Sequence, residues 1–268
     1  MDNLTFFPAY IIITVHLGIV LRMARLIKDG SLREQKSSAE PLTPVNHILG
    51  SGCSLLRHYL IHLLLGEPGI GGSSTPSMVG AVKKWQKSDP QKSLDTWKRL
   101  SEANSQLKIQ LNFLSKLAKE QWDAYKYVID SCNKLRLEKW IEQASEPNKE
   151  AVIKVLLGAK EAMLRIRYHM RLMGEAAGVP IEPESQIKLL DATLNLEGVL
   201  LAGVPRAGGF DAVFAITLGD SSSNVTKAWS SLNVLALLVK EDPCGVSLES
   251  ANPRTNKITS AISLIHIE

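Results

Sequence analysis

The first residues whose types and spacing suggest chemistry are glycines and hydroxyl residues in the stretch GEPGIGGSSTPSMVGAVKKW. They are Gly69, Gly71, Gly72, Ser73, Ser74 and Thr75. Glycine adopts backbone angles that other residues avoid, and serine and threonine cap helix N-termini, where unpaired N–H groups bind phosphate. The stretch therefore predicts either a phosphate-binding turn at the start of a helix or an ordinary capped turn.

A second glycine-rich loop lies in EGVLLAGVPRAGGFDAVFAITLG, between two short apolar runs, Val199–Ala202 and Ala212–Leu218. Both runs are bounded by glycine, which is typical of buried strands. A glycine loop between buried strands lets a ligand approach the backbone closely. We expect a strand–loop–strand unit that either binds a ligand or is only a tight connection.

Apolar residues that recur every three or four positions predict several amphipathic helices. The predicted helices span about 94–132, 149–177 and 184–195, with shorter ones after Thr75 and within SSSNVTKAWSSL. Further strands are predicted in RHYLIHLLLGEP, in NVLALLVKED and in the tail TSAISLIHIE. This order predicts an α+β fold in which helices pack on one face of an antiparallel sheet.

Three arginines on the helix predicted over 149–177 have two interpretations. They are Arg165, Arg167 and Arg171. Their guanidinium groups suit a phosphorylated ligand, but a run of charges on a helix is more commonly a solvent-exposed face. The sequence leaves both interpretations open.

The N-terminal residues 1–28 form an apolar segment, predicted to be helical, that differs from the rest of the chain. No charge occurs from Leu4 to Leu21, and His16 lies within this run. A bilayer core requires about 20 apolar residues, with a lower limit near 17. Residues 4–21 therefore either contact a membrane or form a buried or mistranslated segment without a membrane role. We expect residues 29–54 to be a linker and residues 55–268 to be the folded domain.

Composition narrows the class of protein. The chain has 268 residues, 45% of them apolar and 22% charged, with a net charge of +4. This balance does not indicate a nucleic-acid partner. The three cysteines, Cys53, Cys132 and Cys244, are far apart and form neither a disulfide framework nor a metal clip. We expect no protein-bound structural metal, and the oligomeric state stays open.

Both glycine loops, together with SKLAKEQWDAY, EAMLRIRYHMRLMGEAAGVPIEPESQ and AWSSLNVLALLVKEDP, resemble the C-terminal half of eukaryotic phosphomevalonate kinases, particularly the plant type. These enzymes belong to the galactokinase, homoserine kinase, mevalonate kinase and phosphomevalonate kinase (GHMP) family. The resemblance runs from about Leu63 to Glu268. It implies the fold of a GHMP kinase C-terminal domain.

The resemblance also implies a function. It implies a kinase that transfers the γ-phosphoryl group of ATP to phosphomevalonate with Mg²⁺, in isoprenoid and sterol biosynthesis, in the cytoplasm or the peroxisome. It implies no catalytic residue here, but it does imply residues that contact phosphate or substrate. They are Ser73, Ser74 and Thr75 in the first loop, and Gly203, Ala207, Gly208, Gly209 and Asp211 in the second.

The sequence departs from the family pattern at several points. The family's ATP-binding pattern P-x-x-x-G-L-G-S-S-A has no match, and the stretch GSGCSLL has Cys53 and Ser54 where the family motif G-S-G-F-D has Phe and Asp. Arg206 replaces a glycine, and Ile70 replaces a serine. We therefore expect a chain that lacks the ATP-binding half and releases no ADP by itself. The alternatives are a non-catalytic substrate-binding or regulatory remnant and a truncated gene model.

Overall fold

The computed structural model describes residues 60–69, 72, 75–205 and 208–239. All of them belong to one compact unit. The apolar segment 1–28, the linker 29–54 and the strand predicted in the tail lie outside the described residues. The domain boundaries proposed from the sequence therefore stay predictions.

The described residues form helices and one antiparallel sheet. The helices are α3 (Thr75–Ser88), α4 (Pro90–Glu120), α5 (Trp122–Cys132), η2 (Leu137–Gln143), α6 (Pro147–Ala177), α7 (Glu184–Leu194), η3 (Gly219–Ser221) and α8 (Ser222–Ser231). The strands are β1 (Ile61–Glu67), β2 (Val199–Gly203), β3 (Val213–Leu218) and β4 (Leu235–Leu238). The predicted α+β class is confirmed.

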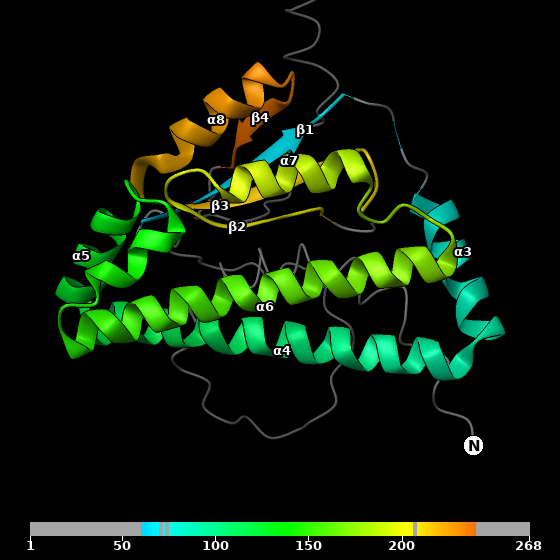
Figure 1. Ribbon diagram of the computed structural model, residues 1–268, viewed down its shortest axis with the longest axis horizontal. Helices are drawn as coiled ribbons and strands as arrows, with labels where there is room; N and C mark the ends of the chain where they lie inside the picture. Colours follow the sequence, from blue (N-terminus) through cyan, green and yellow to red (C-terminus); the bar gives the residue numbers. More distant parts are fainter. Residues whose placement is uncertain (1–59, 70–71, 73–74, 206–207, 240–268) are drawn as a thin grey trace, which may run out of the picture. The chain divides into compact units, whose positions relative to one another are not determined.

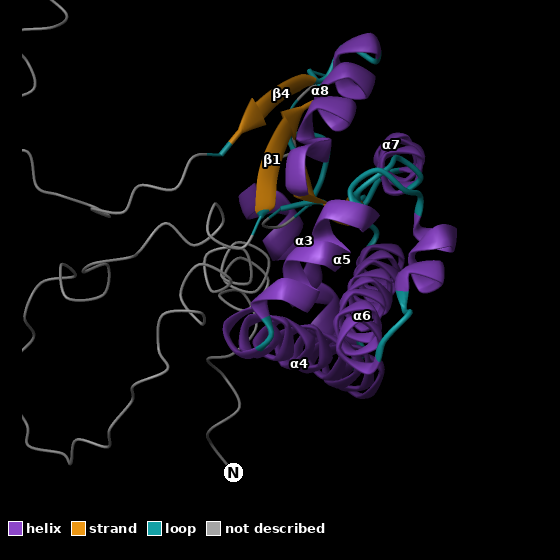
Figure 2. Ribbon diagram, turned by 90° about the vertical axis from the view of Figure 1, so that its left-hand side faces the viewer, coloured by secondary structure: helices purple, strands orange, loops and turns teal. Residues whose placement is uncertain are grey.

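The strand order in the sheet is β2-β3-β1-β4, and every neighbouring pair is antiparallel. The first strand of the described residues, β1, therefore lies in the interior of the sheet, between β3 and β4. The two long helices α4 and α6 pack side by side and run in opposite directions below the sheet (Figure 1). The shorter helix α8 lies beside β1 and β4 (Figure 2).

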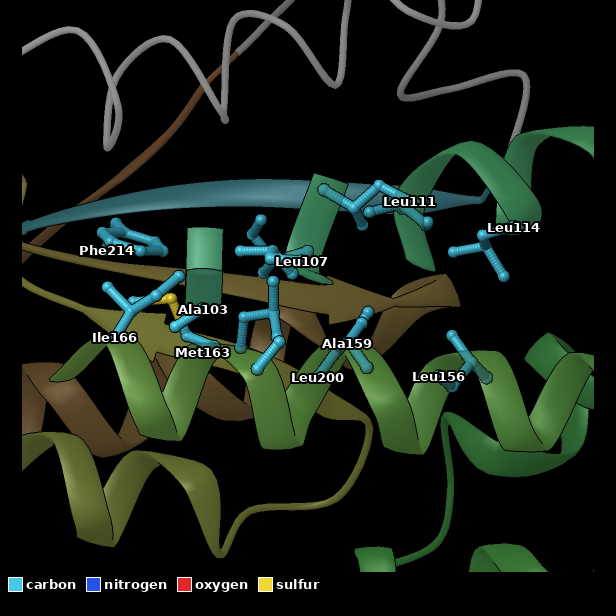
Figure 3. Close-up of a cluster of buried hydrophobic side chains, with 14 of the residues drawn as sticks. Ala103, Leu107, Leu111, Leu114, Leu156, Ala159, Met163, Ile166, Leu200 and Phe214 are labelled. Atoms are coloured by element: carbon cyan, nitrogen blue, oxygen red, sulfur yellow. The ribbon is translucent and has the colours of Figure 1, made fainter. Parts of the chain in front are cut away.

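Apolar side chains bury both faces of the sheet. Toward α4 and α6, Phe214 of β3 and Leu200 of β2 meet residues such as Leu107 and Met163 (Figure 3). These long helices cover one face, as predicted. In addition, α7 and α8 cover the opposite face through Trp229 and its neighbours. Because β2 and β3 are buried along their whole length, their apolar runs are continuous rather than alternating.

One predicted helix is two helices in the structure. The apolar spacing over 94–132 predicted a single helix, but α4 ends at Glu120 and α5 begins at Trp122. Gln121 between them has φ −139°, outside the helical range. A break of one residue changes the helix direction without interrupting the three-to-four spacing, so periodicity does not detect it. Trp122, the first residue of α5, continues this apolar spacing but is 37% exposed.

The end of α6 follows the sequence prediction. Gly178 adopts a left-handed conformation with φ 67°, and the Val179 N–H donates to the Gly174 carbonyl. This is the glycine-terminated helix end that satisfies the last free carbonyls. The chain then forms a short turn, Gly178–Pro183, before α7 begins at Glu184.

Candidate functional site

The strand pairing brings the two glycine loops to the same end of the sheet. In the register, Gly66 of β1 pairs with Val213 of β3, and Gly203 of β2 lies opposite Phe214. The loop that follows β1 and the loop that joins β2 to β3 therefore leave the sheet at the same end of the strands. They are far apart in the sequence but close in space.

The two loops approach each other at Gly72 and Asp211. A Cβ atom on Gly72 would lie 3.3 Å from Oδ1 of Asp211. The Asp211 residue is exposed to solvent. A carboxylate is thus present where the two loops face each other.

The N-terminus of α3 adds the positive end of a helix dipole at this end of the sheet. The helix begins at Thr75, three residues after Gly72, and its first turn contains no acidic residue. The positive end of this helix dipole is therefore not neutralised by a carboxylate of its own first turn. Such an end attracts anions, above all phosphate.

The second loop has a conformation that requires glycine. Gly208 and Gly209 have φ values of 79° and 95°. The Gly208 N–H donates to the Pro205 carbonyl at 3.1 Å, and the Gly209 N–H donates to the Ile181 carbonyl at 2.8 Å. A Cβ atom on Gly208 would lie 2.0 Å from that same Ile181 oxygen. Any side chain at residue 208 would force the loop away from Ile181.

A buried glutamine also holds this loop. Gln186 of α7 is fully buried, and its Nε2 donates to the Phe210 carbonyl at 3.1 Å. Its Oε1 has no hydrogen-bond partner among the described residues. Sequence analysis did not identify Gln186, because a single polar residue on a predicted helix gives no signal of burial.

Next to this contact lies a buried ion-pair cluster. Arg167 of α6 donates to both carboxylate oxygens of Glu182, with the Nη2–Oε1 distance at 2.6 Å. Its Nη2 also lies 2.9 Å from Oδ1 of Asp191. Arg171 Nη1 reaches Oε1 of Glu182 at 3.2 Å. Burial lowers the pKa of Arg167, but the hydrogen bonds and charges of Glu182 and Asp191 outweigh it, so the net pKa is raised.

The cluster corrects the prediction for the three arginines. The side chain of Arg167 is 2% exposed and fully paired, so it neither belongs to a solvated face nor points to a ligand. Arg165 is 59% exposed and pairs with Glu161, which fits the solvent-exposed interpretation. The partner Glu182 lies on a turn beyond the end of the helix, where helical spacing gives no information.

The site residues that the resemblance implies have different positions. Ser73, Ser74 and Ala207 lie outside the described residues. Thr75 is the first residue of α3, and Gly208, Gly209 and Asp211 form the second loop. Gly203 is buried, and a Cβ atom there would lie 2.5 Å from Cε of Met163, so packing alone explains this glycine. Ligand contact by these residues stays a prediction.

Two kinds of feature are absent from the described residues. They contain no group of three or more His, Cys, Asp and Glu residues placed to hold a metal ion. Of the helices in this part of the chain, none combines the length and the apolar character that a membrane span needs.

Comparison with known proteins identifies relatives by sequence. No protein-family model matches the chain. A peroxisomal phosphomevalonate kinase from Arabidopsis thaliana is 68% identical over 209 residues, which are 78% of this chain and 41% of that protein. Phosphomevalonate kinases from Aspergillus fumigatus and Candida albicans are 30% and 29% identical over 58% and 61% of this chain, and 26% and 32% of their own lengths.

Among solved structures, a Lin0012 protein from Listeria innocua is similar with a TM-score of 0.41 and 15% identity, over 67% of this chain and 39% of that chain. The match to the plant relative spans 41% of that relative's length. Over the 209 matched residues, the chain is a homologue of the eukaryotic phosphomevalonate kinases, which confirms the resemblance seen in the two glycine loops.

Proposed function

We propose that this chain supplies the phosphate-binding part of a phosphomevalonate kinase. The observation that carries the proposal is the meeting of two glycine loops at one end of the sheet, with Gly72 next to Asp211. The 68% identity to the plant kinase supports the same function. The substrates would be phosphomevalonate and ATP.

The reaction requires positioning more than acid–base chemistry. A terminal oxygen of the phosphomevalonate phosphate forms a bond to the γ-phosphorus of ATP, while the bond from that phosphorus to the ADP oxygen breaks. A phosphate monoester is largely doubly ionised at pH 7, because its second pKa is about 6. The attacking oxygen therefore needs no base. The protein must instead hold two anions close together and neutralise their charge.

Backbone groups at this site suit that task. The first turn of α3, which begins at Thr75 and contains no carboxylate, would bind phosphate oxygens through its N–H groups. The glycines at 208 and 209 leave room for a phosphate to approach the backbone of the second loop. Ser73 and Ser74, which precede Thr75 in the sequence, would add hydroxyl donors.

Asp211 fits the requirement for Mg²⁺. This ion commonly binds one or two carboxylates together with substrate phosphates and water. Asp211 is the exposed carboxylate at the point where the loops meet, so it would hold the ion there. When bound, Mg²⁺ neutralises charge on the phosphate oxygens.

Calorimetric titration of the full chain tests the proposal. We expect phosphomevalonate to bind and mevalonate, which lacks the phosphate, to bind at least about tenfold more weakly, because charge-assisted hydrogen bonds to phosphate contribute most of the affinity. Equal affinity for the two compounds, or no binding of either, would contradict the proposal. A coupled assay for ADP release then measures turnover.

A second candidate is a chain that binds phosphomevalonate without turning it over. The observation that favours it is the missing match to P-x-x-x-G-L-G-S-S-A in the 268 residues. Phosphomevalonate binding without ADP release would support this second candidate. Binding together with phosphomevalonate-dependent ADP release would exclude it.

For location, we propose the peroxisome or the cytoplasm. The support is the plant relative, which is named peroxisomal. Membrane contact through residues 4–21 is a separate proposal that rests on their apolar sequence. Imaging of a fluorescent fusion, with and without residues 1–28, tests both: a membrane pattern lost on deletion supports contact, and an identical distribution argues against it.

A further inference from the structure

We propose that Glu182 is a positioning residue for the second glycine loop, and that Arg167 and Arg171 act through it. The inference rests on the proposed function in one respect, namely that this loop binds phosphate. The observation behind it is that the turn carrying Glu182 contacts α6 on one side and the loop on the other.

The loop is attached to this turn and to the start of α7 by backbone contacts. The Ile181 carbonyl accepts the Gly209 N–H at 2.8 Å, and Gln186 donates to the Phe210 carbonyl at 3.1 Å. Gly208 lies flat against Ile181, since a Cβ atom there would be 2.0 Å from the carbonyl oxygen. The position of the loop therefore depends on the position of Ile181.

Ile181 is held in turn by the ion pair at the next residue. The Glu182 side chain is 0% exposed, and both its oxygens accept hydrogen bonds from Arg167, with a further one from Arg171. Arg167 of the long helix α6 is 2% exposed. A buried bidentate ion pair between arginine and a carboxylate has one favoured geometry, so it fixes the turn relative to α6.

The turn also packs closely against α6, since a Cβ atom on Gly174 would lie 2.6 Å from the Val179 carbonyl. Beside the turn, Arg171, Glu182 and Pro183 line a groove of about 300 Å³, so protein does not cover the turn on every side. The buried ion pair therefore adds a directional contact to this packing.

The experiment compares E182Q with the matched control E161Q in the full chain. Glu161 pairs with Arg165 on the exposed face of α6, so the loss of the Glu161 charge leaves the turn untouched. Hydrogen exchange is measured for the peptide 204–212 and for a core peptide of α4. Affinity for phosphomevalonate is measured in parallel.

We expect E182Q to speed exchange in 204–212 while α4 is unchanged, and to weaken phosphomevalonate binding about tenfold or more, because small displacements of a binding loop are costly. E161Q should match the wild type in both. A folded E182Q with wild-type exchange in 204–212, or with equally faster exchange in α4, would overturn the inference.

If E182Q does not fold, R171Q and R171K decide by the same criteria, because Arg171 is partly exposed and makes one contact with Glu182. R171Q should loosen 204–212, and R171K, which keeps the charge, should restore part of the protection. Identical exchange in R171Q and the wild type would overturn the inference. If the wild-type chain binds no phosphomevalonate, the proposed function fails, while the exchange data still decide the positioning role.

Discussion

Gly72 and Asp211 face each other across two loops that the sequence separates widely, and a single added methyl group at residue 72 would lie 3.3 Å from the Asp211 carboxylate. This proximity results from β1 lying next to β3 in the sheet. It joins a helix N-terminus without acidic residues, a glycine loop and a carboxylate in one place.

The role of Asp211 can be tested with D211N, which keeps the shape and removes the charge. We expect Mg²⁺-dependent binding of phosphomevalonate to weaken at least about tenfold, since a carboxylate ligand contributes directly to holding the ion. Titration of phosphomevalonate with and without Mg²⁺ measures this effect. The control is D220N, because Asp220 is an exposed acid on η3 outside the loop. Equal losses in the two variants would indicate a general charge effect.

The glycine requirement of the second loop can be tested with G208A against G69A. Both positions have positive φ, and each alanine costs about 1–2 kcal/mol for its backbone conformation. Only at residue 208 would the new Cβ also collide with the Ile181 carbonyl, while Gly69 has open space around it. Urea unfolding should therefore give a loss for G208A that exceeds the loss for G69A by about 1–3 kcal/mol. Equal losses would mean that the loop moves away from Ile181 freely.

The hydrogen bond between α7 and α8 predicts a stability effect away from the site. The buried Trp229 Nε1 donates to Thr193 Oγ1 at 2.8 Å, and that hydroxyl donates to the Leu189 carbonyl. T193V would leave the indole N–H buried without a partner, at a cost of about 1–3 kcal/mol. T226V is the control, because the hydroxyl of Thr226 also donates to a backbone carbonyl of its own helix, but at an exposed position. In thermal unfolding, we expect a lower Tm for T193V and an unchanged Tm for T226V.

Cys132 predicts a dependence of stability on alkaline pH. Burial raises the pKa of its thiol from 9.0 to about 12. In the unfolded chain the thiol loses its proton near pH 9, while in the folded chain it keeps it, so the folded state binds more protons between these values. Stability should therefore fall as pH rises above about 9. Unfolding curves at pH 8 and pH 10 measure this fall, and C132A should reduce it.

A thiol reagent checks the same burial directly. In a variant with Cys53 and Cys244 replaced by serine, Cys132 should stay unmodified at pH 8 and react only after urea is added, since the reactive form is the thiolate. Rapid labelling of the folded protein would contradict the buried position.

Most helices and strands followed from local sequence. The strands β2 and β3 and the helices α6 and α7 lie within a few residues of their predicted bounds, because apolar spacing and terminating glycines such as Gly178 act over a few neighbouring residues. The break at Gln121 escaped prediction for the same reason. One extended residue leaves the spacing unchanged, although it redirects the chain.

The sequence by itself determined where the two glycine loops lie along the chain, and that each follows a short apolar strand, since backbone preference and periodicity are local properties. Only the tertiary structure decided that the loops meet, because the order β2-β3-β1-β4 depends on long-range pairing. It also decided the role of Arg167, whose partner Glu182 reaches it only when the turn after Gly178 folds back on α6. Burial of a charge depends on all the elements packed around it, and no local pattern encodes that arrangement.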